Sequence, residues 1–316
     1  MYKGECGVWL RFAVPEYCGG WHLRDVLRRL AISARLSRAV KQGGGFFLDG
    51  APVHTNAVCR AGQTLSFCLP DEPPTQVLPQ PLPLTVCYED GQAAVLCKPA
   101  GMAVHPTKGY PNGTLANAWL GLLQSRGQAG VFRPITRLDR DTSGLVLCAK
   151  NVYAAPLLAQ TAQKEYLALC QGRPAAPEGI IDAPIGLAPG STVVRQVCGQ
   201  GKPSRTRYAV LASGGGLSLV RARLLTGRTH QIRVHFAFLG CPLAGDELYG
   251  GSRLRIARQA LHCARLCFAS PADGRPRVIR APLPPDLAAL AGGIPGAGAA
   301  LAAFYAEDVQ SEAAPQ

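Results

Sequence analysis

The sequence predicts an α+β protein made of a small domain and a larger one. Short apolar runs bounded by turn residues are typical of strands, and several stretches with apolar residues three or four positions apart are typical of helices. Six prolines between residues 69 and 83 divide the chain. We therefore expect a small domain at 1–69 (core about 16–69), a semi-rigid linker at 70–83, a large domain at 84–292 and a flexible tail at 293–316.

Composition excludes several classes of protein. Apolar residues make up 47% of the 316 residues, which suffices for a substantial core. No run reaches the ~18 apolar residues of a membrane span, and the N-terminus does not resemble a signal peptide. The twelve cysteines include no C-x-x-C pair, and several lie in apolar runs. We expect a cytoplasmic monomer with reduced thiols and no metal site, although His262-Cys263 with Cys267 forms a tight cluster.

The charge of the chain favours a polyanionic partner. Thirty-three Lys and Arg stand against twenty Asp and Glu, a formal net charge of +13. Between Arg221 and Arg280 there are eleven Arg, no Lys and three acids. The planar guanidinium fork suits phosphate recognition, so we expect a nucleic acid, while a solvated basic face is the alternative.

Two short helices and a hairpin are expected in the small domain. Apolar positions from Leu23 to Leu30 share one helical face, and Ser33 can cap a second helix. Asp49-Gly50 suits a hairpin turn between strands at 46–48 and 51–53, and a further strand is expected at 64–67. Six basic residues and one acid lie between Leu23 and Gln42, so this helix pair is predicted to present a basic surface.

The sequence of the larger domain predicts mainly strands. Helices are expected from Gly113-Thr114 to Leu122, over 157–163, and over 230–239 with Thr229 as the cap. The strands are expected at 84–88, 93–97, 145–149, 165–170, 205–211, 217–225 and 259–268.

One stretch combines charged and turn-forming residues immediately before a buried strand. Asp139 and Asp141 alternate with Arg137 and Arg140, and Thr142-Ser143-Gly144 can bend the backbone before an apolar run. A carboxylate on a loop held by a rigid strand suits a nucleophile or a general base. A solvated loop with local ion pairs is the alternative.

Four blocks of residues follow one another in the larger domain. They are Lys98-Pro99-Ala100-Gly101 with Val104-His105-Pro106, Arg137 to Gly144, Gly227 to His235, and Gly245-Asp246-Glu247-Leu248-Tyr249-Gly250, followed by Ala281-Pro282-Leu283-Pro284. Taken in order, these blocks resemble the RluA-type pseudouridine synthases over about residues 84–290. Residues 16–69, with their two basic helices and the later Ala61-Gly62-Gln63-Thr64-Leu65, resemble the alpha-L RNA-binding module of a small-subunit ribosomal protein.

The resemblance implies a fold, a reaction and a substrate. The fold would be a mixed, mainly antiparallel sheet crossed by a basic cleft, behind a small RNA-binding domain. The reaction would be the isomerisation of specific uridines in RNA to pseudouridine, without a cofactor or a metal. Large-subunit ribosomal RNA is the expected substrate, with transfer RNA as the alternative.

The resemblance also implies roles for particular residues. Asp139 matches the nucleophile, Tyr166 matches an aromatic residue that stacks on the uracil, and Arg233 matches the basic partner of the nucleophile. Arg137 matches a residue linked to extruding the target base, and Arg228 is a second choice to Arg233 or a phosphate contact. Thr136 departs from the family, which usually has His there; Asp141 is expected to support the loop.

Two alternatives come from other classes of protein. A non-catalytic RNA-binding or ribosome-assembly factor on the same fold would keep the basic surfaces, but the retained Asp139 argues against it. A glycoside hydrolase needs a second carboxylate facing the first, for which Asp246 is a candidate. The arginine-rich region suits phosphate better than a neutral sugar.

Overall fold

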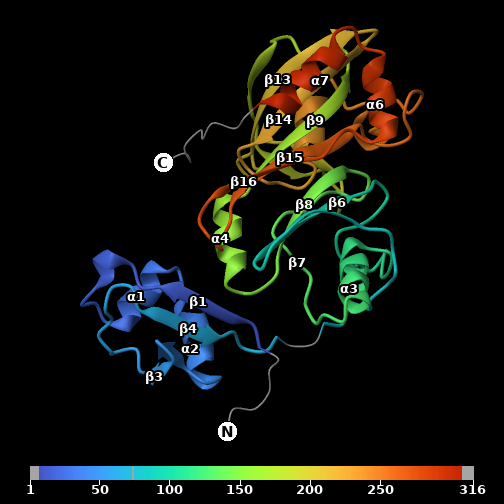
Figure 1. The fold of residues 1–316 in the computed structure, drawn as a ribbon. Helices are drawn as coiled ribbons and strands as arrows, with labels where there is room; N and C mark the ends of the chain where they lie inside the picture. The colour runs from blue at the N-terminus through green and yellow to red at the C-terminus, as the bar shows by residue number, and fades with distance from the viewer. Residues whose placement is uncertain (1–6, 73–74, 308–316) are drawn as a thin grey trace. The chain divides into compact units, whose positions relative to one another are not determined.

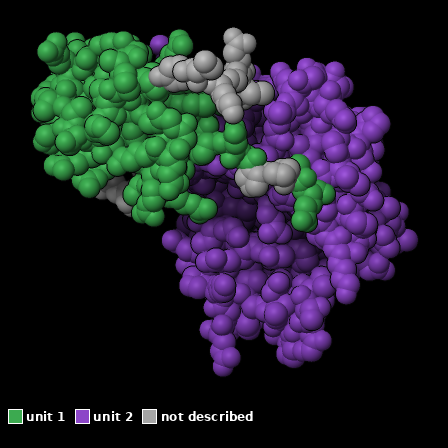
Figure 2. Space-filling model, turned by 90° about the horizontal axis from the view of Figure 1, so that it is seen from below, with its two compact units in different colours: residues 1–76 green, residues 77–316 purple. Residues whose placement is uncertain are grey.

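The computed structural model describes residues 7–72 and 75–307, in two compact units at 1–76 and 77–316 (Figure 2). The division between the units falls inside the proline-rich stretch at 70–83. None of the described helices is long and apolar enough to cross a lipid bilayer.

The first unit is a four-stranded antiparallel sheet with two helices, and the predicted helices and hairpin are confirmed. The sheet order is β1-β4-β2-β3, and β1 was not anticipated because its residues carry no clear pattern. The elements are β1 (Trp9–Ala13), η1 (Glu16–Cys18), α1 (Leu23–Arg29), α2 (Ala34–Gln42), β2 (Phe46–Leu48), β3 (Ala51–Val53) and β4 (Thr64–Cys68).

Local chemistry explains the boundaries of these elements. The Ser33 hydroxyl accepts a hydrogen bond from the Leu36 backbone at 3.2 Å, so Ser33 caps α2 as predicted. Asp49 and Gly50 have φ of 48° and 82°, the left-handed conformation that a tight hairpin turn requires. The basic side chains of α1 and α2 are exposed, as the helical spacing predicted; they are Arg24, Arg28, Arg29, Arg35, Arg38 and Lys41.

The second unit is built on a mixed, mainly antiparallel ten-stranded sheet, as expected. Its main path is β10-β13-β14-β9-β15-β8-β6-β5, and β15 with β8 is the parallel pair in the described part of this sheet. The strands are β5 (Thr85–Glu89), β6 (Ala93–Lys98), β7 (Arg133–Pro134), β8 (Ser143–Ala149), β9 (Gln163–Gln171), β10 (Glu178–Asp182), β13 (Arg205–Gly214), β14 (Leu217–Leu224), β15 (Leu261–Ala269) and β16 (Pro276–Arg280), with β11 (Ile185–Leu187) and β12 (Arg195–Val197) forming a separate hairpin.

Helices cover both faces of this sheet, so strand β9 is buried on both sides (Figure 1). Tyr166 and Ala168 face a core shared with α3 (Leu115–Ser125), α4 (Ala154–Thr161) and α5 (Gln231–Phe238). Leu167 and Leu169 face a second core, closed by α6 (Pro285–Gly292) and α7 (Ala297–Ala306). We call the first side the front face and the second the back face.

The C-terminal region differs from the flexible tail expected from residue 293. Residues 297–306 form helix α7, and Phe304 is buried in the back-face core. The alanine-rich sequence has high helix propensity, although its composition carries no amphipathic pattern that predicts docking.

The second half of the proline-rich stretch lies against α3 rather than hanging free. The Asn117 side-chain amide donates to the Leu78 carbonyl at 2.8 Å, and the Gln80 backbone N–H donates to the Asn117 carbonyl at 3.0 Å. A Cβ at Gly121 would overlap the backbone of Gln80, so the glycine permits this close approach. The linker expected at 70–83 therefore becomes part of the second unit by about residue 78.

Candidate active site

The loop that carries Asp139 is held by side chains that reach its backbone. The Lys98 ammonium lies at the end of β6 and donates to the carbonyls of Pro99, Met102 and Arg140, each at 2.8 Å. Arg258 Nη1 donates to the Asp141 carbonyl at 3.1 Å. These contacts hold the loop backbone at Arg140 and Asp141.

Lys98 is fully buried, and its three hydrogen-bond acceptors indicate which charge state it adopts. Burial lowers the pKa of Lys98 from 10.5 to about 7, while Asp141 and Asp139 act in the opposite direction. Three carbonyl acceptors use all three hydrogens of an ammonium group, whereas a neutral amine has only two N–H groups to donate. This geometry therefore favours a cationic Lys98 beneath the loop.

The second position of the strand after the loop is one that only glycine can occupy. Gly144 has φ of 112°, and a Cβ there would overlap the backbone carbonyl of Cys263. This close approach accompanies the parallel pairing of β8 with β15. The predicted turn-forming role of Thr142-Ser143-Gly144 thus has a specific cause at Gly144.

Asp139 meets its partners through one carboxylate oxygen. Arg233 Nη1 donates to Oδ2 at 3.2 Å, and His230 Nε2 lies 3.9 Å from the same oxygen. Among the residues that the structure describes, Oδ1 accepts no hydrogen bond, and the side chain is 27% exposed. One oxygen is thus held and the other remains available.

Arg233 is itself fixed by a second carboxylate and an aromatic ring. Its Nε and Nη2 donate to the two oxygens of Asp246 at 2.7 and 2.8 Å. The Tyr249 ring centroid lies 4.9 Å from the guanidinium carbon. Although burial opposes the charge, the hydrogen bonds with Asp246 raise the pKa of Arg233, so it stays cationic beside Asp139.

These residues border an open pocket of about 370 Å³. The cleft was expected to be basic, but the charges that line this pocket balance. The four arginines are Arg140, Arg233, Arg253 and Arg258, and the four acids are Asp139, Asp141, Asp246 and Glu247. Two of these acids, Asp139 and Asp141, come from outside residues 221–280, so the charge count over that range could not show the balance.

Two of the five predicted site residues meet directly, namely Asp139 and Arg233. Tyr166 lies on the front face of β9, where burial, with Cys263 and Asp139 nearby, raises its pKa well above 10. Arg137 is exposed, and its carbonyl accepts from Lys164 Nζ at 3.4 Å. Arg228 is exposed and donates to the Pro203 carbonyl at 3.2 Å rather than to Asp139.

Thr136 and Thr229 also have different roles from those that their patterns suggested. Thr136 is buried, and its hydroxyl accepts from the Leu147 N–H at 3.0 Å, so it stabilises the entry to the loop. Thr229 does not cap α5; His230 precedes the helix with φ of 58° and no side-chain cap.

Sequence reasoning missed Asp246, Tyr249 and His230 as parts of this cluster. All three lie in the blocks that carry the family resemblance, so the sequence marked them as part of conspicuous motifs. Their contacts with one another, however, depend on the fold. Asp246 had been considered only as the second carboxylate of a glycosidase. Its side chain is 1% exposed and both of its oxygens bind Arg233, which leaves it poorly placed to protonate a sugar.

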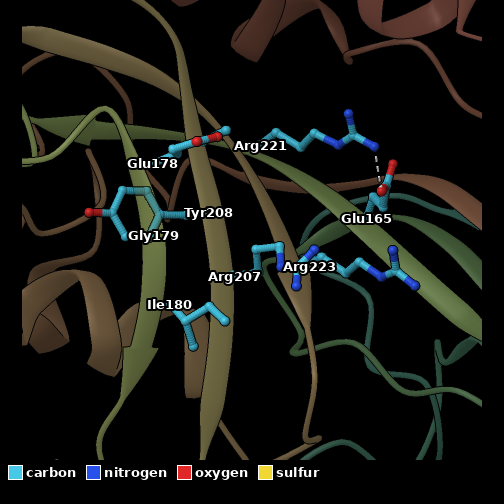
Figure 3. A pocket seen from close by; sticks show the side chains of 9 residues that line it. Glu165, Glu178, Gly179, Ile180, Arg207, Tyr208, Arg221 and Arg223 are labelled. Carbon is cyan, nitrogen blue, oxygen red and sulfur yellow. Dashed lines mark hydrogen bonds and ion pairs between the residues drawn. The ribbon is translucent and has the colours of Figure 1, made fainter. Parts of the chain in front are cut away.

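A second pocket, of about 470 Å³, lies on the back face of the sheet (Figure 3). Its lining includes Glu165, Arg221 and Arg223, and Glu165 Oε1 accepts from Arg221 Nη2 at 2.7 Å. Glu165 and Tyr166 are adjacent in β9, so they point to opposite faces. This pocket is therefore separated from Asp139 by the sheet.

No cluster of three or more His, Cys, Asp or Glu in residues 7–72 and 75–307 is arranged to hold a metal ion. The cysteines that the structure describes are all free thiols.

Comparison with known proteins places this chain in a family. Residues 92–238 match the family model described as RNA pseudouridylate synthase. A Bacillus subtilis protein named as an uncharacterized RNA pseudouridine synthase is 38% identical over 284 residues, which cover 88% of this chain and 97% of that protein. The ribosomal large subunit pseudouridine synthase D of Xanthomonas campestris is 37% identical over 299 residues, covering 87% and 89%.

A solved structure agrees with these matches. The human RNA pseudouridylate synthase domain containing 1 protein superposes with a TM-score of 0.54 at 28% identity, covering 69% of this chain and 89% of that one.

Proposed function

The chain belongs to the RNA pseudouridine synthase family, of the RluA type, and we propose that it converts specific uridines of large-subunit ribosomal RNA to pseudouridine with Asp139 as the nucleophile. The observation that carries the assignment of Asp139 is its geometry. Arg233 holds Oδ2, while Oδ1 accepts no hydrogen bond from the described residues, beside an open pocket.

The charges explain how this carboxylate can act. Cleavage of the glycosidic bond leaves its electron pair on N1 of uracil and builds positive charge at C1′ of the ribose. The free oxygen of Asp139 can stabilise or trap that charge. After the uracil turns, its C5 bonds to C1′, the carboxylate is released, and the proton on C5 is lost while N1 gains one.

No cofactor is required by this balance. Substrate and product are isomers, so no electrons or groups pass to a second molecule. Arg233 keeps Asp139 ionised and aimed, since a neighbouring cation favours the carboxylate form.

Tyr166 is proposed to contact the uracil. Burial raises its pKa further above the ordinary value of 10, so the phenol is protonated at neutral pH. The Lys164 ammonium lies 5.5 Å from the ring centroid, and the ring is proposed to stack on the uracil. No hydrogen bond is among the influences on the pKa of this phenol, which are burial, Cys263 and Asp139, so its hydroxyl is proposed to contact the base as it rotates.

Several basic surfaces support RNA as the substrate. The exposed cations of α1 and α2 suit phosphate contacts, as expected for an alpha-L type module. Arg137 and Arg228 are exposed in the second unit and are proposed to contact the RNA, Arg137 beside the extruded base. A large-subunit ribosomal RNA target is supported by the name of the Xanthomonas relative.

The test of this proposal is Asp139→Ala on a ribosomal RNA transcript tritiated at C5 of uridine. Because C5 loses its hydrogen, product formation releases tritium to water. We expect release by the wild-type protein and none by the variant, with the Kd for the transcript changed less than about twofold. Tritium release by Asp139→Ala at the wild-type rate would overturn the role of Asp139.

Two controls separate the substrate from the chemistry. A transfer RNA transcript labelled in the same way tests the alternative target. A wild-type protein that binds both RNAs but releases no tritium would instead indicate a non-catalytic RNA-binding factor.

A further inference from the structure

The geometry points to Tyr249 as a positioning residue that holds both partners of the nucleophile, fixing the His230 tautomer with its hydroxyl and supporting Arg233 with its ring. This inference rests on the proposed role of Asp139. Tyr249 is half-buried in η2 (Glu247–Tyr249), directly after Asp246, and its side chain contacts residues from two other elements.

The hydroxyl group of Tyr249 takes part in a directional chain of hydrogen bonds. The backbone N–H of Arg195, in β12, donates to the hydroxyl oxygen at 3.1 Å. The same oxygen lies 2.7 Å from His230 Nδ1. Because the Arg195 N–H can only donate, the hydroxyl hydrogen of Tyr249 is free to be donated to His230 Nδ1.

This direction determines where the His230 proton lies. With Nδ1 accepting, a neutral imidazole carries its hydrogen on Nε2, the nitrogen 3.9 Å from Asp139 Oδ2. The opposite tautomer would leave the hydroxyl hydrogen of Tyr249 without an acceptor among the described residues, and would turn a lone pair of His230 towards a carboxylate. The Nε2–H tautomer gives the Tyr249 hydroxyl an acceptor and turns an N–H, rather than a lone pair, towards the carboxylate.

Burial favours a neutral ring, while the neighbouring charges oppose one another: Asp139 and Asp246 raise the pKa of His230, and Arg233 and Arg195 lower it. Burial is the largest influence and lowers this pKa below 6.5. His230 also has φ of 58°, a left-handed conformation that is uncommon for a residue with a side chain. His230, the residue with this backbone conformation, is also the residue whose imidazole lies between Tyr249 and Asp139.

The ring of Tyr249 meets the other partner of Asp139. It lies 4.9 Å from the Arg233 guanidinium carbon, while Asp246 binds Nε and Nη2, so Nη1 is the nitrogen left for Asp139. Arg233 and His230 thus both approach Oδ2 of Asp139, and the side chains of both residues contact Tyr249. Tyr249 thereby helps to keep Oδ1 available for C1′.

The tautomer can be measured without any activity. In full-length protein labelled with ¹⁵N-histidine, long-range ¹H–¹⁵N spectra distinguish a protonated from an unprotonated ring nitrogen, and the His230 signals are assigned by their loss in His230→Gln. We expect an unprotonated Nδ1 and a protonated Nε2 at neutral pH. A protonated Nδ1 in the wild-type protein overturns the proposal.

Two substitutions of Tyr249 separate its hydroxyl from its ring. Tyr249→Phe keeps the ring against Arg233 and removes the hydroxyl, so the His230 tautomers should mix and kcat should fall about tenfold, the loss expected for one hydrogen bond. Tyr249→Leu removes both contacts, and we expect about a 100-fold loss. In both variants KM for RNA should change less than about twofold.

The matched control is Tyr305→Phe, which removes a hydroxyl bonded to the Ala281 carbonyl on the back face. It should leave the His230 spectrum and kcat unchanged. A Tyr249→Phe protein with either an unchanged His230 spectrum or a wild-type kcat overturns the proposal. If wild-type protein released no tritium at all, the proposed function would fail, while the tautomer measurement would still decide the hydrogen-bond chain.

Discussion

The two faces of the catalytic sheet each hold a buried arginine between two carboxylates and against an aromatic ring. On the front face Arg233 contacts Asp139 and Asp246 and meets the ring of Tyr249. On the back face Arg265 contacts Glu165 and Glu307, and its guanidinium carbon lies 4.2 Å from the centroid of Phe304. The interactions are of the same kind.

Their surroundings differ. Asp139 is on a loop beside a pocket and keeps one oxygen free, whereas Glu165 binds Arg221 through one oxygen and Arg265 through the other. Arg265 also donates to the Phe304 carbonyl in α7, so the back-face network ties the C-terminal helix to strands β9 and β15. We propose that the buried arginine–carboxylate pair serves catalysis on the front face, whereas on the back face it attaches a helix. The difference is whether a carboxylate oxygen is left available.

The same substitution on the two faces tests this difference, and the largest effect is expected on the front. In Arg233→Met, Asp139 loses its main donor, and the buried Asp246 loses its partner. We expect tritium release from C5-labelled RNA to fall about 10²–10³-fold, the usual loss when one preorganised donor to a reacting group is removed. A variant within threefold of the wild-type rate would contradict the front-face assignment.

Arg265→Met is the counterpart on the back face. Without this arginine, one carboxylate oxygen of the buried Glu165 has no hydrogen-bond donor, and the contacts to α7 are lost. The free energy of unfolding should therefore fall by about 3–5 kcal/mol. The rate of tritium release, measured well below the unfolding temperature, should stay within about twofold. Loss of activity without loss of stability, by urea unfolding, would show that the faces are not separable in this way.

A change of pH should affect stability through the buried His262. His262, in β15, bonds Ser143 Oγ through Nδ1 at 2.9 Å and the Ala281 carbonyl through Nε2 at 3.3 Å. Burial lowers its pKa from 6.5 to about 4. Between these values the unfolded chain binds a proton that the folded protein does not, so stability is retained above pH 6.5 and falls by up to about 3 kcal/mol as the pH approaches 4.

Urea unfolding at pH 4.5, 5.5 and 7.5 measures this slope. In His262→Gln the difference between pH 7.5 and 4.5 should shrink by about 2–3 kcal/mol, whatever the variant's stability at pH 7.5. An unchanged slope would exclude His262 as its source.

The smallest effect is expected at the exposed end of the back-face network. Glu307 is 48% exposed and bonds Arg221 and Arg265 at 2.9 and 3.1 Å. Because solvent screens such contacts, Glu307→Gln should lower the free energy of unfolding by at most about 1 kcal/mol, without changing the rate of tritium release. A loss comparable to that of Arg265→Met would mean that Glu307 is as important as the buried partner Glu165.

Local patterns predicted much of the fold. The cap at Ser33, the helix start at Gly113-Thr114, the Asp49-Gly50 turn and the apolar runs of the central strands each depend on neighbours within a few positions, and the structure confirms them. Helix α7 was missed because its small apolar residues show no preferred face, and only Phe304 against Arg265 reveals its docking site.

The sequence alone also identified the family and singled out Asp139 and Arg233, because ordered blocks of residues preserve the chemistry of a site. The tertiary structure decided between Arg233 and the second choice Arg228: Arg233 reaches Asp139, 94 positions earlier in the chain, whereas Arg228 bonds the Pro203 carbonyl. It also decided that Asp246, Tyr249 and His230 lie around that contact. Turns and caps are settled by adjacent residues, whereas the partners of a charge depend on strand order and burial, which bring distant segments together.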